Sequence, residues 1–156
     1  MGSSGPGQNA KAQLAVFLAK FSPEIQKTTK AVLVKMRSRV PGACEVVYDN
    51  YNALVVGFSA TEKTWNSVFS IAVYPRWINL FFLQNALDLT DPEKLLQGRG
   101  KVVRSIRLTS AADLDRPAVR ALMRQALSLA DPPYDCRAKG RIVIRSISKK
   151  QRSRRP

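Results

Sequence analysis

The sequence predicts an α+β domain in which helices flank a run of short antiparallel strands, and three observations support this. Apolar residues recur at three- and four-residue spacing near both ends of the domain, which is typical of helices packed on a core. Between these segments they recur with a period of two in short runs separated by turn-forming residues, which indicates strands joined by tight connections. The length of 156 residues suits a single domain, and 45% hydrophobic against 24% charged residues predicts that most of it folds.

Two helices are expected first. Asn9–Lys20 carries leucine and phenylalanine at helical spacing, and follows a glycine- and serine-rich leader, residues 1–10, that we expect to be flexible. The second helix begins after Ser22, which can cap it, and ends at Pro41-Gly42. A basic stripe lies opposite its apolar face; a solvated surface and a binding surface both fit this stripe, which includes Lys27, Lys30 and Arg37.

About five strands are expected next. They cover Cys44–Tyr48, Ala53–Ser59, Trp65–Tyr74, Trp77–Leu83 and Lys101–Thr109. The fourth is apolar on both faces except at Asn79, which indicates a strand that is central or covered by helices on one side. Arg141–Ile147 could add one more strand, although its apolar residues do not alternate cleanly, and disorder is expected after Ser148.

Two further helices complete the prediction. A short one begins at Asp91 and ends at Gly98 or Gly100, and a longer one begins at Asp113 or Asp115 and runs to Ala130. We therefore expect one domain over residues 11–135, followed by a tail over residues 136–156.

The composition excludes several classes of site. The chain has no histidine, which removes Ser-His-Asp and Cys-His catalytic sites and the usual histidine-containing metal sites. Cys44 and Cys136 are far apart and form no C-x-x-C pair. No segment is long enough to cross a bilayer and the leader lacks the basic region of a secretory signal, so a cytoplasmic protein without a membrane partner is expected. Nothing selects a general base, so a non-enzymatic binding domain is the favoured class.

The net charge of +15 is concentrated at the two ends of the chain. Residues 41–135 carry ten basic and ten acidic side chains, whereas residues 136–156 carry nine basic side chains and no acidic one. A basic tail attracts polyanions without sequence preference, so nucleic acid is a predicted partner, and a merely solubilising end also fits. The candidate contacts are Lys27, Lys30, Arg37, Arg104, Arg137, Arg141, Arg145, Lys149, Lys150 and Arg152.

Two groups of carboxylates are candidate metal ligands. Glu45 and Asp49 lie four residues apart on one predicted strand and therefore share a face, where they could bind a metal or simply line the wet side of the sheet. Asp88, Asp91 and Glu93 could hold a hard cation, although ordinary helix capping is the favoured explanation for them.

A third candidate is an anion or small-molecule pocket. Alternation places Arg104 on the apolar face of its strand, where it could hold an anion, pair with Glu45, or emerge at a sheet edge. Tyr74, Arg76 and Trp77 could line a pocket or belong to the core.

Several short motifs follow one another in the order of these elements. They are Pro41-Gly42-Ala43 with Glu45 just after, Tyr74-Pro75-Arg76, Asp91-Pro92 through Leu95-Leu96-Gln97-Gly98, Gly100-Lys101 with Arg104, Ile106-Arg107-Leu108, and Asp113-Leu114-Asp115. In these motifs the chain resembles the YdhG-like family of small bacterial proteins, over Lys11–Ala130. The resemblance implies a twisted antiparallel sheet with helices packed on one face, similar to frataxin.

Some members of that family are described as frataxin-like intracellular iron chaperones. The resemblance therefore implies that ferrous iron is the ligand and that an iron-sulfur assembly protein is a partner. Frataxin-like iron binding is associated with an acidic ridge along the first helix and the first strand. Here the long basic helix has only Glu24, so Glu45 and Asp49 would have to supply the ligands.

Overall fold

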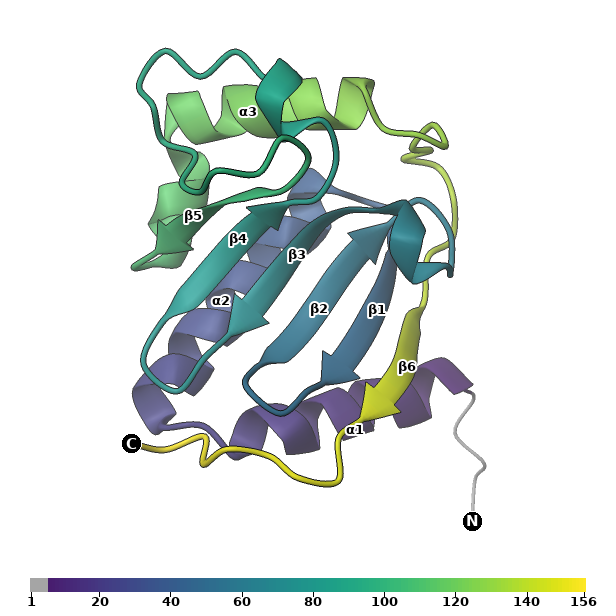
Figure 1. Cartoon of the computed structure of the whole chain (residues 1–156). Helices are drawn as coiled ribbons and strands as arrows, with labels where there is room; N and C mark the ends of the chain where they lie inside the picture. The colour runs from purple at the N-terminus through teal and green to yellow at the C-terminus, as the bar shows by residue number, and fades with distance from the viewer. Residues whose placement is uncertain (1–5) are drawn as a thin grey trace.

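The computed structural model describes residues 6–156 and confirms the α+β class (Figure 1). The helices are α1 (Pro6–Ala19), α2 (Pro23–Arg39) and α3 (Pro117–Ser128). The strands are β1 (Cys44–Asp49), β2 (Leu54–Ser59), β3 (Ser67–Val73), β4 (Ile78–Phe82), β5 (Arg104–Leu108) and β6 (Ile142–Ile147). Short 3-10 helices occupy Thr64–Asn66, Ala86–Asp88 and Ala111–Asp115.

The described strands form one mixed sheet in the order β5-β4-β3-β2-β1-β6. Strands β1 to β5 form the expected antiparallel meander, whereas β6 pairs parallel with β1. The expected count of about five strands does not hold, because the candidate strand 141–147 joins the sheet and makes it mixed. After α3 the chain returns to the end at which β1 begins, so β6 runs in the same direction as β1 (Figure 1).

Two glycines allow β6 to reach this position. Gly42 has a φ of +81°, and a Cβ atom there would lie 2.5 Å from the carbonyl oxygen of Ala138. A Cβ atom at Gly140 would lie 2.0 Å from the carbonyl oxygen of Ala43. The segments that lead into β1 and β6 are therefore in backbone contact, and a larger residue at either glycine would push the two strands apart.

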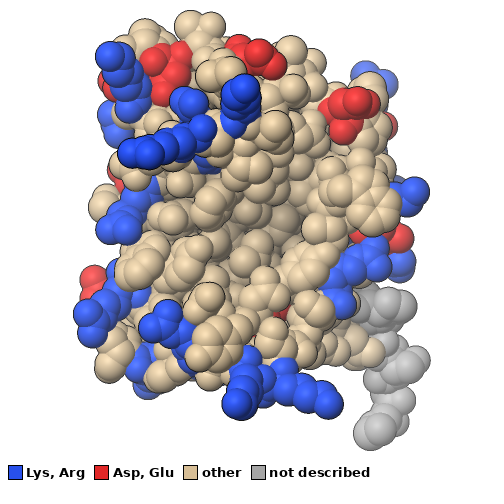
Figure 2. Space-filling model, in the orientation of Figure 1, with Lys and Arg blue, Asp and Glu red and all other residues tan. Residues whose placement is uncertain are grey.

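One face of the sheet is covered and the other is open. On the covered face, alternate side chains of the strands join α1, α2 and α3 in the core; they include Val47, Val56, Ile71, Leu80 and Ile106. No helix lies in front of the opposite face in Figure 1. Neighbouring positions at its centre hold the small residues Gly57 and Ser70, and the face is hollowed and uncharged there (Figure 2).

The short helix expected after Asp91 is absent. Instead, the carboxylate of Asp91 accepts hydrogen bonds from the backbone N–H groups of Leu95 and Leu96, both at 2.9 Å. Lys94 has a φ of +52°, and Gln97 forms an isolated bridge with Ser105. Asp91 is therefore a capping residue as expected, but it caps a turn and not a helix, since an aspartate side chain can do either.

The two ends of the chain also differ from a simple leader and tail. Residues 1–5 of the expected leader lie outside the described residues, and residues 6–10 belong to α1. Residues 148–156, where disorder is expected, contain no helix or strand, but they follow a defined path past the ends of the strands at the bottom of Figure 1.

Candidate functional site

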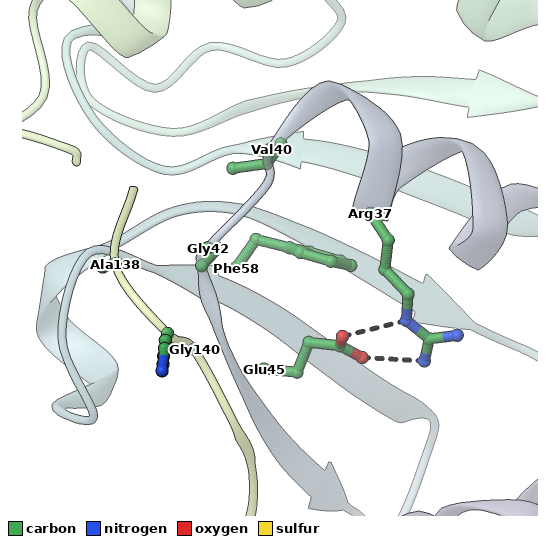
Figure 3. Close-up of a pocket in the computed structure, with 9 residues that line it drawn as sticks. Arg37, Val40, Gly42, Glu45, Phe58, Ala138 and Gly140 are labelled. Carbon is green, nitrogen blue, oxygen red and sulfur yellow. Dashed lines mark hydrogen bonds and ion pairs between the residues drawn. The ribbon is translucent and has the colours of Figure 1, made fainter. Parts of the chain in front are cut away.

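Glu45, the first candidate metal ligand, is held by an arginine from α2. The guanidinium of Arg37 donates from Nε and from a terminal nitrogen to the two carboxylate oxygens, each at 2.9 Å (Figure 3). This hydrogen bond from Arg37 raises the pKa of the guanidinium above its ordinary value. The pair lines a cavity of about 380 Å³ together with Phe58 and Gly140. Glu45 thus lies on the helix-covered face and not on the wet face, and its two oxygens are already occupied.

Asp49, the second candidate, is fully buried between two cations. Its side chain is 0% exposed and accepts from Lys20 at 2.9 Å and from Arg154 at 2.8 Å. Burial raises the pKa of Asp49, but hydrogen bonds from Lys20, Gln151 and Arg154 outweigh this and hold the pKa below its ordinary value. The carboxylate is therefore a neutralised structural group at the junction of α1, β1 and the tail.

The two carboxylates do not converge on one point. Four residues of strand separate them by about 13 Å, and each has its own cationic partners. In the second acidic group, Asp91 caps a turn, Glu93 lies 3.9 Å from Arg116, and Asp88 is exposed. Among the described residues, no group of three or more aspartates, glutamates or cysteines could hold a metal ion.

Arg104 lies at the wrong end of its strand to form a pocket with Trp77. It pairs in register with Phe82 at the far end of β4, whereas Trp77 precedes the start of that strand. The Nε of Arg104 donates to the carbonyl oxygen of Gly100 at 2.7 Å, so the side chain closes the preceding loop. The proposed pairing of Arg104 with Glu45 is wrong, because Arg37 takes that position.

The other basic candidates fall into two sets. Arg141 and Arg145 both contact Glu62, the former through its carboxylate and the latter through its carbonyl oxygen. The remaining candidates have exposed side chains and no ion pair within the described residues; they are Lys27, Lys30, Arg137, Lys149, Lys150 and Arg152.

The structure does bring the three pocket candidates together. Tyr74 and Trp77 close the turn between β3 and β4, and their rings stack with centroids 5.0 Å apart at 24°. Both rings and Arg76 line a cavity of about 630 Å³. On β5, the guanidinium of Arg107 lies 5.0 Å from the ring centroid of Trp77.

The other wall of this cavity is the tail, which the sequence does not identify. Arg152, Ser153, Arg155 and Pro156 line it from below, and Asn52 lines it from the turn between β1 and β2. The tail is fixed by backbone hydrogen bonds, Ser148 to Asp49 at 2.8 Å and Arg152 to Tyr51 at 2.9 Å. Sequence alone marks these arginines as basic, but carries no local signal that Arg154 is buried.

Comparison with protein-family models, curated proteins and solved structures found no match to this chain. The YdhG-like resemblance therefore stays an expectation. In the described part of the chain, none of the helices has both the length and the apolar character needed to span a bilayer.

Proposed function

We propose that this chain is a non-enzymatic domain that binds a polyanion, specifically nucleic acid, at one end of its sheet. We define the hairpin end as the region where turns 50–53 and 74–77, the α1–α2 junction and tail residues 148–156 meet. Exposed cations that form no ion pair with any described carboxylate gather there, and this observation carries the proposal. They are Arg76, Lys149, Lys150, Arg152 and Arg155.

Carboxylates are few at the hairpin end. Asp49 is buried and already neutralised, which leaves Glu24 on the first turn of α2 as an exposed acid near Arg76. On the face shown in Figure 2, most carboxylates lie toward the α3 end, mixed with basic side chains, whereas the margin along the tail carries Lys and Arg. The local potential is therefore positive at the hairpin end, where binding of a nucleic acid would release the counterions condensed on its phosphates.

The contacts of the cations favour this function over metal binding. Within the described residues, seven of the 26 lysines and arginines form ion pairs, and these include the partners of Glu45 and Asp49. Four of the five candidate metal ligands, all except Asp88, have hydrogen-bond or ion-pair partners, whereas most lysines and arginines form no ion pair within the described residues.

Fluorescence anisotropy with a labelled oligothymidylate tests the proposal. We expect affinity to fall steeply with salt, and the triple variant Lys149→Gln/Lys150→Gln/Arg152→Gln to reduce the slope of log K against log salt by about 2. A matched control removes three exposed arginines outside the hairpin end, Arg99→Gln/Arg120→Gln/Arg124→Gln. An affinity that does not depend on the salt concentration, or an equal reduction of the slope in the control variant, contradicts the proposal.

A further inference from the structure

The cavity between the β3–β4 turn and the tail has the parts of a site for a nucleobase with its adjoining phosphates. We propose that it receives one unpaired base of a single-stranded nucleic acid, which contacts Tyr74 and Trp77 while Arg76, Arg152 and Arg155 bind the flanking phosphates. This inference rests on the proposed function and adds to it a defined subsite and a preference for single strands.

The aromatic side of the cavity suits a planar ligand. Tyr74 and Trp77 form one stacked unit held by the turn, with the backbone N–H of Tyr74 donating to the carbonyl oxygen of Trp77 at 2.9 Å. Trp77 is 36% exposed, but Tyr74 stacks on its ring and the side chain of Arg107 lies over it, so a base that stacks on Trp77 takes the place of Arg107. A rigid pair of rings loses little conformational freedom on binding, and any base can stack on such a platform regardless of sequence.

The polar side of the cavity suits phosphate. The guanidinium of Arg155 donates to the carbonyl oxygens of Lys20 at 3.2 Å and Ala19 at 3.3 Å, and that of Arg152 to the side-chain oxygen of Asn52 at 3.3 Å. These partners are neutral, so they orient the guanidinium groups without cancelling their charge. Arg76 has no hydrogen bond or ion pair among the described residues. Arginine is well suited to phosphate because its planar fork donates two parallel hydrogen bonds.

The size and construction of the cavity also fit a nucleotide. Its volume of about 630 Å³ lies in the middle of the range for small-ligand sites, about 300–1,000 Å³. One wall is the tail, whose position depends on the buried contact of Arg154 with Asp49 at 2.8 Å. In a duplex the bases are stacked within the helix and cannot enter such a cavity, so single strands should be preferred.

Three labelled probes separate the base from the phosphates: a 12-mer oligothymidylate, the same backbone without bases, and a 12-base-pair duplex. For Trp77→Ala we expect about tenfold weaker binding of the oligothymidylate, down to the level of the abasic probe, whose own affinity does not change. Arg76→Gln should weaken both single-stranded probes. The control Trp65→Ala removes an exposed tryptophan, 75% exposed and stacked against Lys63 outside the hairpin end, and should change none of the affinities.

A second measurement does not depend on Trp77→Ala folding. The chain has two tryptophans, so in the variant Trp65→Phe all tryptophan emission comes from Trp77. Quenching by the oligothymidylate but not by the abasic probe is expected from stacking. Absence of that quenching, or equal affinity for duplex and single strand, overturns the base subsite. If the triple variant Lys149→Gln/Lys150→Gln/Arg152→Gln still lowers the affinity for every probe, the proposed polyanion binding survives the loss of the base subsite. If no probe binds the wild-type protein, the polyanion binding and the base subsite are both wrong.

Discussion

Glu45 and Asp49 stand on the same strand and the same face, yet the structure uses them differently. The side chain of Glu45 is 10% exposed and pairs with Arg37, which is 40% exposed and eight residues away in the chain. The side chain of Asp49 is 0% exposed and pairs with Arg154, which is 2% exposed and 105 residues away. The Glu45 pair joins neighbouring elements at the cavity of Figure 3, whereas the Asp49 pair holds the tail at the hairpin end.

The comparison shows that burial decides what an ion pair does. A pair that reaches water contributes little, because solvent screens both charges. A fully buried charge must keep its partner, because an unpaired charge in the interior is strongly destabilising. Asp49 is therefore expected to control the position of residues 148–156, and with them the cavity, while Glu45 is expected to contribute only locally.

The largest effect is expected for Asp49→Ala. The substitution leaves Arg154 buried without its carboxylate, and breaking a buried pair in this way costs about 3–5 kcal/mol of unfolding free energy. Urea denaturation measures the loss, and Asp113→Ala, which removes a capping carboxylate from the 3-10 helix Ala111–Asp115, serves as a control. A loss below about 1 kcal/mol would show that Asp49 behaves like a surface group.

The next effect is expected for Arg154→Gln. Asp49 keeps Lys20 as a partner in this variant, so the loss should be that of one charged hydrogen bond, about 1.5–3 kcal/mol. Amide hydrogen exchange should rise in residues 148–156 while β3 and β4 stay protected. Arg155→Gln, which removes the hydrogen bonds of an exposed side chain to the carbonyl oxygens of Ala19 and Lys20, should change neither the unfolding free energy nor the exchange. Unchanged exchange in Arg154→Gln would mean that the backbone hydrogen bonds alone hold residues 148–156.

The pH dependence of stability should also distinguish Asp49. Because its pKa is lowered in the folded state, its contribution is complete above the ordinary carboxyl pKa of about 3.9 and is lost as the pH falls through the lower folded value. The difference in unfolding free energy between the wild type and Asp49→Asn should thus be constant from neutral pH to about pH 5 and shrink in more acidic solution. A difference that grows on acidification would contradict the assigned direction.

A smaller effect is expected for Glu45→Gln. Arg37 reaches solvent and can be hydrated when its partner is lost, so the cost should be about 1 kcal/mol or less. Equal losses for Glu45→Gln and Asp49→Asn would remove the contrast between the two ends of β1.

The smallest effect is expected from ferrous iron. Each carboxylate on β1 is occupied by one or two cationic groups, so micromolar Fe²⁺ under anaerobic conditions should leave Tm unchanged. A rise in Tm that disappears in Glu45→Ala would instead support the iron ligand implied by the YdhG-like resemblance.

The parts of the fold that could be predicted are those that depend on residues close together in the sequence. Ser22 caps α2 as expected, accepting from the N–H of Ile25, and the alternating segments became β1 to β5. The sequence also marks Tyr74 and Trp77 as pocket candidates, but it leaves open whether they belong to the core and does not predict that their rings stack.

The parts that could not be predicted depend on contacts distant in the chain. Nothing near Arg154 distinguishes it from the other basic residues of the tail, since its burial depends on Asp49, Tyr51 and Phe21. The direction of β6 depends on the backbone contact between Gly42 and Ala138. Likewise, the partner of Glu45 could have been Arg104 by alternation alone, and only the packing of α2 selects Arg37.

The parallel pairing of β6 with β1 has a consequence for synthesis on the ribosome. β1 emerges early, but the strand that covers its free edge is made almost 100 residues later, at Ile142–Ile147. Until then the N–H and C=O groups along that edge of β1 are unpaired, and Asp49 lacks Arg154. An exposed strand edge invites pairing with other chains, so the growing chain is open to aggregation until β6 and Arg154 have emerged.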